Sequence, residues 1–163
     1  MPGLYYDEFS PGQSFDHPIR RTLTEMDNVL FSALTHNPAA LHLDEEYCRN
    51  ETEFGARLVN SALTLGLIVG ISVSDTTLGT TVANLGWDEV RFPKPLFHGD
   101  TVHVRSTVHD MRESRSRPQC GIVTFIHQGF NQKDELVASC KRSALMKKKP
   151  MDSASGAKDA YPL

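Results

Sequence analysis

The sequence predicts an α+β domain in which an antiparallel sheet wraps one long, buried helix. Two patterns indicate this fold class. Residues 60–74 are apolar on every face of a helix, which is typical of a helix that is buried on all sides. After that segment the hydrophobicity alternates with a period of two over about four further segments, as it does in antiparallel strands. A sheet wrapped around the helix is one way to bury it.

Size and charge limit the class of protein. The chain has 163 residues, of which 39% are hydrophobic and 23% charged, which suits a single globular domain. Its formal net charge of −3 lacks the positive field that nucleic-acid binding needs, so we expect no nucleic-acid partner. We predict one domain over residues 1–149 and a disordered tail over 150–163, where small and polar residues dominate.

Neither a membrane span nor a signal peptide is expected. The longest apolar stretch, residues 62–73, is interrupted by polar residues and is too short to cross a bilayer. The N-terminus has no basic start followed by an apolar run. We therefore expect a cytoplasmic protein with no membrane partner.

The first segments are an arm and a helix. Residues 1–22 are expected to be extended, with a turn at Pro11-Gly12. Thr24, followed by Asp27, is a weak capping box that begins a helix ending near residue 35. The apolar residues that recur there at helical spacing are Met26, Leu30, Ala33 and Leu34.

The next segments lead into the central helix. Residues 35–43 are predicted as a loop, and Asp44 as the cap of a second helix start. Asn60 is predicted to cap the central helix. Gly66 and Gly70 lie four residues apart, and we expect them to let a neighbouring element approach closely.

Four strands are expected after this helix, separated by turn residues; they cover residues 81–92, 101–108, 121–130 and 136–146. The outer face of their sheet would be free to pair with another subunit. The three cysteines, Cys48, Cys120 and Cys140, are widely spaced and fit no metal-ligand pattern. We predict reduced core thiols and no metal site.

Four motifs stand in register along the chain: TLTEMD at 22–27, NPAALHLD at 37–44, TEFGARLVN at 52–60 and VRFPKPLFHGDTV at 90–102. Together they resemble the MaoC-like branch of the hotdog fold, the (R)-specific enoyl-CoA hydratases and dehydratases, over residues 4 to about 147. The resemblance implies a hotdog fold, an acyl-CoA thioester substrate, and a homodimer or higher homo-oligomer. It implies no cofactor apart from the coenzyme A of the substrate.

The sequence departs from this family at two positions. Asn37 stands where the family has its catalytic Asp, counted back from His42, and Asn60-Ser61 replaces the usual His-Gly at the start of the central helix. The motif NPAALHLD, with Asn in place of Asp, is similar to the motif of family members that act on branched dicarboxylic thioesters such as mesaconyl- or itaconyl-CoA. The resemblance thus implies a hydratase or dehydratase of a short dicarboxylic enoyl-CoA, branched or unbranched.

Hydration of an enoyl thioester needs an acid/base and a held water. Histidine takes and returns a proton near neutral pH, so His42 is the candidate acid/base. An amide takes no proton there, so Asn37 would position the water, or would only be a turn residue before Pro38. Asp44 either orients the His42 ring or only caps the following helix.

The thioester oxygen also needs stabilisation as negative charge builds on it. Free backbone N–H groups at the start of the central helix, that of Ser61 above all, are the candidates, with Asn60 as the cap. Gly55 and Arg57 are assigned to substrate binding. Arg57, Arg91 and Lys94 are candidates for the CoA phosphates or a second carboxylate, and each of the three is alternatively a solvated surface charge.

Two other functions remain open from the sequence. One is a thioesterase on the same fold, which would release a free thiol from saturated acyl-CoA. The other is a non-catalytic subunit that binds acyl-CoA or supports an active partner, an alternative that Asn37 keeps open.

Overall fold

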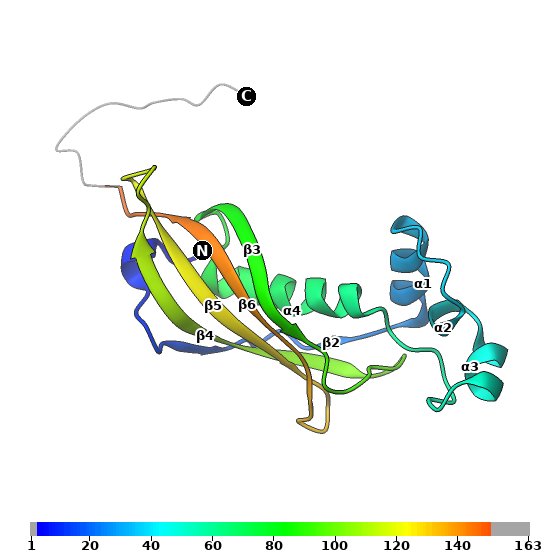
Figure 1. The fold of residues 1–163 in the computed structure, drawn as a ribbon. Coiled ribbons are helices and arrows are strands. Elements are labelled where there is room, and N and C mark those ends of the chain that lie inside the picture. The colour runs from blue at the N-terminus through cyan, green and yellow to red at the C-terminus, as the bar shows by residue number, and fades with distance from the viewer. Residues whose placement is uncertain (1–2, 151–163) are drawn as a thin grey trace.

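A curved antiparallel sheet holds one long helix, α4 (Ser61–Thr76), against its inner face (Figure 1). The computed structural model describes residues 3–150, so the tail expected over 150–163 lies outside the described residues except for Pro150. The sheet order is β1-β4-β5-β6-β3, and β2 also pairs with β4. The strands are β1 (Ser14–Asp16), β2 (Arg21–Thr22), β3 (Thr81–Arg91), β4 (Thr101–Glu113), β5 (Cys120–Phe130) and β6 (Leu136–Lys147). The α+β class and the four long strands are confirmed.

Alternation along the strands directs one set of side chains at α4. On β4 the inward residues are Val102, Val104, Ser106 and Val108, all buried. On β5 a Cβ atom at Gly129 would lie 2.5 Å from Cγ2 of Ile68, so only glycine lets α4 approach the sheet this closely. The glycine that permits close packing is therefore on the strand rather than on the helix.

The prediction that α4 is buried on all faces is wrong for the single chain. Ile68 and Ile71 are buried, whereas Gly66 and Gly70 are exposed and a Cβ at either would meet nothing within 4 Å. The distribution of apolar residues in the sequence shows which faces of a helix are apolar. It does not show which of those faces are covered by the same chain. The apolar residues beside these two glycines, such as Leu65 and Val69, are only half-buried.

Three short helices gather beyond the N-terminal end of α4 (Figure 1). They are α1 (Glu25–Leu34), α2 (Ala40–Leu43) and α3 (Glu45–Glu51). The capping box of Thr24 and Asp27 is present, as expected. The segment predicted as a loop over 35–43 instead contains the single helical turn α2.

Helix α1 turns its apolar stripe outward. Met26 and Leu34 are each 72% exposed and Leu30 is 53% exposed, whereas the buried residues of α1 are the polar Asn28 and Ser32. The helix was predicted correctly, but its apolar side does not face the core of this chain. The same periodicity arises whether a stripe packs inside the chain or against something outside it.

The N-terminal arm contains more regular structure than expected. A 3-10 turn, η1, covers Tyr6–Glu8, and the turn at Pro11-Gly12 is present, with Gly12 at a φ of 84°. Both β1 and β2 pair with β4. Strands of two or three residues are too short to give a periodic signal.

A polar cluster lies in the core near the C-terminal end of α4. Asp75 accepts from Nδ1 of His17 at 2.8 Å, and Ser106 Oγ lies 2.8 Å from His17 Nε2 and 2.6 Å from His127 Nδ1. Burial, with Arg142 and His17 nearby, lowers the pKa of His127 to about 3. This histidine therefore stays neutral in the folded protein.

All three cysteines are buried and free, as expected, and burial raises the pKa of Cys140 to about 11. Among residues 3–150, no helix is both long and apolar enough to cross a membrane.

Candidate active site

His42 lies on the single turn of α2, with its ring held at one nitrogen. Its Nδ1–H donates to the carbonyl oxygen of Leu58 at 2.9 Å, and the side chain is half-buried. This bond makes Nδ1 the protonated nitrogen, so Nε2 carries the free lone pair. The backbone N–H of Leu58 in turn donates to Leu41, which ties α2 to the segment before α4. The neutral imidazole can therefore accept a proton at Nε2.

The start of α4 offers backbone donors close to this segment. The side chain of Asn60 accepts from the N–H of Ala62 at 3.0 Å, which confirms Asn60 as the N-cap. Within residues 3–150, the N–H of Ser61 donates to no acceptor. A free N–H at a helix N-terminus carries partial positive charge and can hold a developing oxyanion.

Asn28 was missed by the sequence analysis, yet it joins these two features. Its side chain is fully buried. Oδ1 accepts from the N–H of Asn60 at 2.8 Å, and Nδ2 donates to the carbonyl of Leu58 at 2.9 Å. The available signal was a polar pair four residues apart, Asn28 and Ser32, opposite the apolar stripe of α1, because asparagine is unfavourable inside a helix unless its amide is used.

Asn37 and Asp44 both serve local turns. Oδ1 of Asn37 accepts from the N–H of Ala39 at 3.1 Å, directly before α2. Oδ1 of Asp44 accepts from the N–H of Tyr47 at 2.9 Å and caps α3. No hydrogen bond joins either side chain to His42 within residues 3–150. Asp44 therefore acts as a cap and not as a partner of the imidazole.

Arg57 is occupied by two carboxylates. Its Nη1 lies 2.7 Å from Glu25 and its Nε lies 2.9 Å from Glu45, so it links α1 to α3. These bonds raise the pKa of Arg57 and lower those of both glutamates. Gly55 is exposed, with a φ of 67°, in the turn before Arg57. Both residues lie in the segment that leads into α4.

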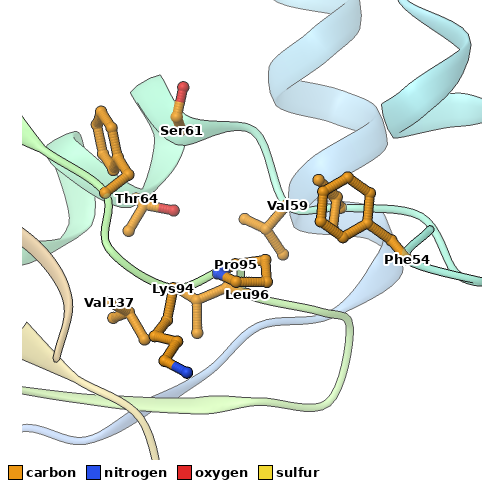
Figure 2. Close-up of a pocket in the computed structure, with 10 residues that line it drawn as sticks. Phe54, Val59, Ser61, Thr64, Lys94, Pro95, Leu96 and Val137 are labelled. Carbon is orange, nitrogen blue, oxygen red and sulfur yellow. The ribbon is translucent and has the colours of Figure 1, made fainter. Parts of the chain in front are cut away.

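An apolar pocket of about 240 Å³ opens beside the first turn of α4 (Figure 2). Among its described lining residues, Lys94 is the one charged side chain. In the view of Figure 2, Ser61 and the Lys94 ammonium lie on opposite sides of the apolar lining residues Val59 and Leu96. The lining consists of Phe54, Leu58, Val59, Ser61, Thr64, Phe92, Lys94, Pro95, Leu96 and Val137.

Leu58 connects the pocket to His42, because it both lines the cavity and accepts from the imidazole. Arg91 is exposed at the end of β3, and its Nη1 donates to the carbonyl of Val90 at 3.1 Å. It does not line the pocket. Ser61 and Lys94 thus line the pocket, and His42 is linked to it through Leu58. Asn60 caps the helix that Ser61 begins, whereas Asn37, Gly55 and Arg57 are not among the described lining residues.

A sequence profile of the MaoC like domain matches residues 8–129. The chain belongs to this family. It is 32% identical over 147 residues to the mesaconyl-CoA hydratase of Cereibacter sphaeroides, covering 90% of this chain and 42% of that protein. It is 30% identical over 154 residues to the beta-methylmalyl-CoA dehydratase of Chloroflexus aurantiacus, covering 91% of this chain and 41% of that protein. This MaoC-like chain thus spans less than half the length of these relatives.

Solved structures confirm the hotdog fold of the MaoC-like chain. A MaoC-like dehydratase from Rhodospirillum rubrum superposes with a TM-score of 0.78 at 26% identity, covering 91% of this chain and all of that chain. A Mycobacterium tuberculosis protein with a double hotdog fold gives a TM-score of 0.82 at 27% identity, covering 96% of this chain and 47% of that one. The present chain therefore corresponds in extent to one hotdog unit.

Proposed function

We propose that this MaoC-like chain is an enoyl-CoA hydratase or dehydratase unit. The observation that carries the proposal is the arrangement of His42 on Leu58, where within residues 3–150 Nδ1 is bound and Nε2 is free, together with the open N–H of Ser61 three residues after Leu58. Hydration requires an acid/base and an oxyanion donor, and Leu58 and Ser61 line the same apolar pocket. The hydratase and dehydratase relatives support the same reaction class.

The proton can travel through one imidazole. Nε2 of His42 accepts a proton from water while the water oxygen bonds to the β-carbon of the enoyl group. Negative charge moves to the thioester oxygen, where the N–H of Ser61 stabilises it. The protonated imidazole then returns its proton to the α-carbon, so that one water is added and His42 ends neutral. Asn37 takes no proton in this scheme, and its Nδ2, which has no hydrogen-bond partner within residues 3–150, would position the water.

A short dicarboxylic acyl group suits the pocket best. Its walls are mostly apolar, and Lys94 takes part in no ion pair within residues 3–150. Because Ser61 and Lys94 both line the pocket and lie on opposite sides of its apolar residues in Figure 2, a thioester held at Ser61 would place a distal carboxylate on the side of Lys94. We therefore propose a substrate of the mesaconyl-CoA type, as the mesaconyl-CoA hydratase relative also favours.

The substrate proposal is tested with a matched pair of variants. Purified wild type is mixed with mesaconyl-CoA or crotonyl-CoA, and the loss of enoyl absorbance is followed. Lys94→Met should raise KM for mesaconyl-CoA about tenfold or more and leave KM for crotonyl-CoA within about threefold, since only the first carries a distal carboxylate. Lys133→Met, at an exposed lysine outside the pocket, is the control. An equal change for both substrates would contradict a role of Lys94 in selectivity.

A non-catalytic acyl-CoA-binding subunit is the second candidate. Asn37 favours it, because an amide in a local turn stands where the family resemblance places the catalytic Asp. This alternative predicts that wild type is inactive on both thioesters and that Asn37→Asp creates activity. The hydratase proposal predicts that wild type is active and that Asn37→Asp only changes rate or substrate preference. Thiol release from a saturated acyl-CoA would instead indicate a thioesterase.

We propose a homodimer or higher homo-oligomer as the working assembly. Among the described strands, β3 is the last in the sheet order and pairs with β6 alone. It exposes Val82, Leu85 and Trp87, and an edge strand with exposed apolar residues readily pairs with another chain. The double hotdog relative, of which this chain covers 47%, favours a second copy as the partner. Light scattering should give at least twice the chain mass of 18.1 kDa, and a monomer mass would contradict the assembly.

A further inference from the structure

The side chain of Asn28 is the convergence point of three segments that are far apart in sequence. It is buried completely on α1. Nδ2 lies 2.9 Å from the carbonyl oxygen of Leu58, 3.0 Å from Nε2 of His98 and 3.3 Å from the carbonyl oxygen of His42. Since an amide nitrogen carries two hydrogens, the two shorter contacts, to Leu58 and His98, account for both donors.

One carbonyl receives both Asn28 and the candidate acid/base. The oxygen of Leu58 accepts from Nδ2 of Asn28 and from Nδ1 of His42, each at 2.9 Å. A carbonyl oxygen has two lone pairs, so these two donors can share it. The amide of Asn28 thereby holds the acceptor that orients the imidazole and determines which of its nitrogens is protonated.

The other end of the same amide holds the start of α4. Oδ1 of Asn28 accepts from the N–H of Asn60 at 2.8 Å, and Asn60 caps α4 through its own side chain. The two polar ends of one buried side chain thus contact the anchor of the imidazole and the residue before Ser61. A movement of Asn28 would displace both parts of the proposed site together.

His98 constrains the orientation of this amide. Its Nε2 accepts from Nδ2 of Asn28, which requires the neutral ring with Nε2 unprotonated. Around the ring stand Arg57 before α4, Glu25 on α1 and Glu45 on α3. Burial, and secondarily the charge of Arg57, lowers the pKa of His98, which favours the neutral ring.

Protonation of His98 would oppose this arrangement. The protonated ring presents an N–H to the Nδ2 of Asn28, and two donors repel. If the amide rotated to present Oδ1 to His98, it would lose the bonds to Leu58 and to the N–H of Asn60. One orientation of Asn28 satisfies all of these partners only while His98 is neutral.

We propose that Asn28 is a positioning residue that fixes His42 and the start of α4 relative to each other. Neutral His98 fixes the orientation of the Asn28 amide. The inference rests on the proposed hydratase function of His42. Its structural part is measurable without any turnover, because it concerns the tautomer of one imidazole.

Asn28→Asp tests this positioning role with a nearly isosteric change. The carboxylate keeps the acceptor for Asn60 but faces the carbonyl of Leu58 with an oxygen in place of a donor. We expect kcat to fall at least tenfold with KM within about threefold, since misplacement of a catalytic group mainly lowers kcat. By ¹⁵N NMR, wild-type His42 should be the Nδ1–H tautomer; in the variant it should shift toward Nε2–H, and the pKa of His98 should rise beside the new carboxylate.

The control is Asn50→Asp, which makes the same change in charge on the exposed side of α3. It should leave kcat, the His42 tautomer and the His98 titration as in wild type. If Asn28→Asp lowers kcat while tautomer and titration stay unchanged, Asn28 only stabilises the fold and the proposal is overturned. If wild type hydrates no enoyl-CoA but the tautomer shifts as expected, the proposed function fails and the positioning contact holds.

A second variant covers the case in which Asn28→Asp does not fold. His98→Gln offers an amide oxygen to Asn28 and removes the titration. Because a protonated His98 opposes the bound orientation of Asn28, kcat should fall more steeply with decreasing pH in wild type than in His98→Gln. Equal slopes in the two proteins would overturn the role of His98.

Discussion

Nδ1 of His42 donates to the carbonyl oxygen of Leu58 at 2.9 Å, so the candidate acid/base is fastened to the segment that leads into α4. The anchor is backbone, and its position therefore depends on how residues 58–60 are held. The N–H of Val59 donates to Leu96 at 2.8 Å, and Leu58 forms a bridge with Phe97. The site is thus built by strand-like pairing between two loops.

Replacement of His42 should abolish the hydration of enoyl-CoA. His42→Asn cannot carry the proton, and we expect kcat to fall about 10²–10⁴-fold, the usual contribution of a general acid/base. His36→Asn is the matched control, because His36 is exposed and its φ of 54° suits asparagine. The assay is loss of enoyl absorbance. Comparable activity of the two variants would remove the assignment of His42.

Asn37 should matter for stability through its oxygen alone. Asn37→Asp keeps the acceptor for the N–H of Ala39, whereas Asn37→Ala loses it. We expect the alanine variant to lose about 1 kcal/mol of unfolding free energy and the aspartate variant to stay near wild type. Urea unfolding at neutral pH measures both. An equal loss in the two variants would show that the amide nitrogen, not the oxygen, holds the turn.

Two glycines should respond to alanine with opposite signs. Gly66→Ala adds a methyl group to an open face of α4 and should stabilise the protein by up to about 1 kcal/mol. Gly129→Ala places Cβ 2.5 Å from Cγ2 of Ile68 and should destabilise it by about 1–3 kcal/mol. Thermal unfolding distinguishes them. A loss in Gly66→Ala would instead indicate that a second copy packs on this face.

His127 should make the fold sensitive to acid. Its pKa is lowered from 6.5 to about 3 in the folded state, chiefly by burial. As the pH falls below about 6.5, His127 binds a proton in the unfolded chain but not in the folded chain. The unfolding free energy therefore decreases by up to about 1.4 kcal/mol per pH unit until about pH 3. Above pH 6.5 this histidine has no effect on the slope.

The test compares denaturant unfolding at several pH values between 4 and 7 in His127→Asn and His109→Asn. Asparagine at 127 retains a donor for Ser106 and does not titrate. The unfolding free energy should therefore fall less steeply with decreasing pH, by the slope that uptake of about one proton produces. His109 is exposed and should leave the decline as in wild type. Parallel curves for wild type and His127→Asn would contradict the assignment of the buried proton uptake to His127.

Local patterns in the sequence determined the strands, the capped helices and the family. Thr24 with Asp27, and Asn60 with Ala62, are contacts across two or three residues, and alternation along a strand is local as well. The motif around His42 was readable for the same reason. The short strands of the arm and the turn α2 were not predicted, because so few residues contain no period.

The tertiary structure alone decided which residues meet at the site and which faces are covered. Asn28 contacts Leu58, Asn60 and His98 at separations of 30, 32 and 70 residues, and hydrogen bonds between distant segments leave no periodic trace. The apolar stripe of α1 has helical spacing but points outward. The spacing shows that a helix has an apolar side and a polar side, but it does not show what each side contacts. Chain topology supplies that information, because it decides which distant segments lie next to each other around α4.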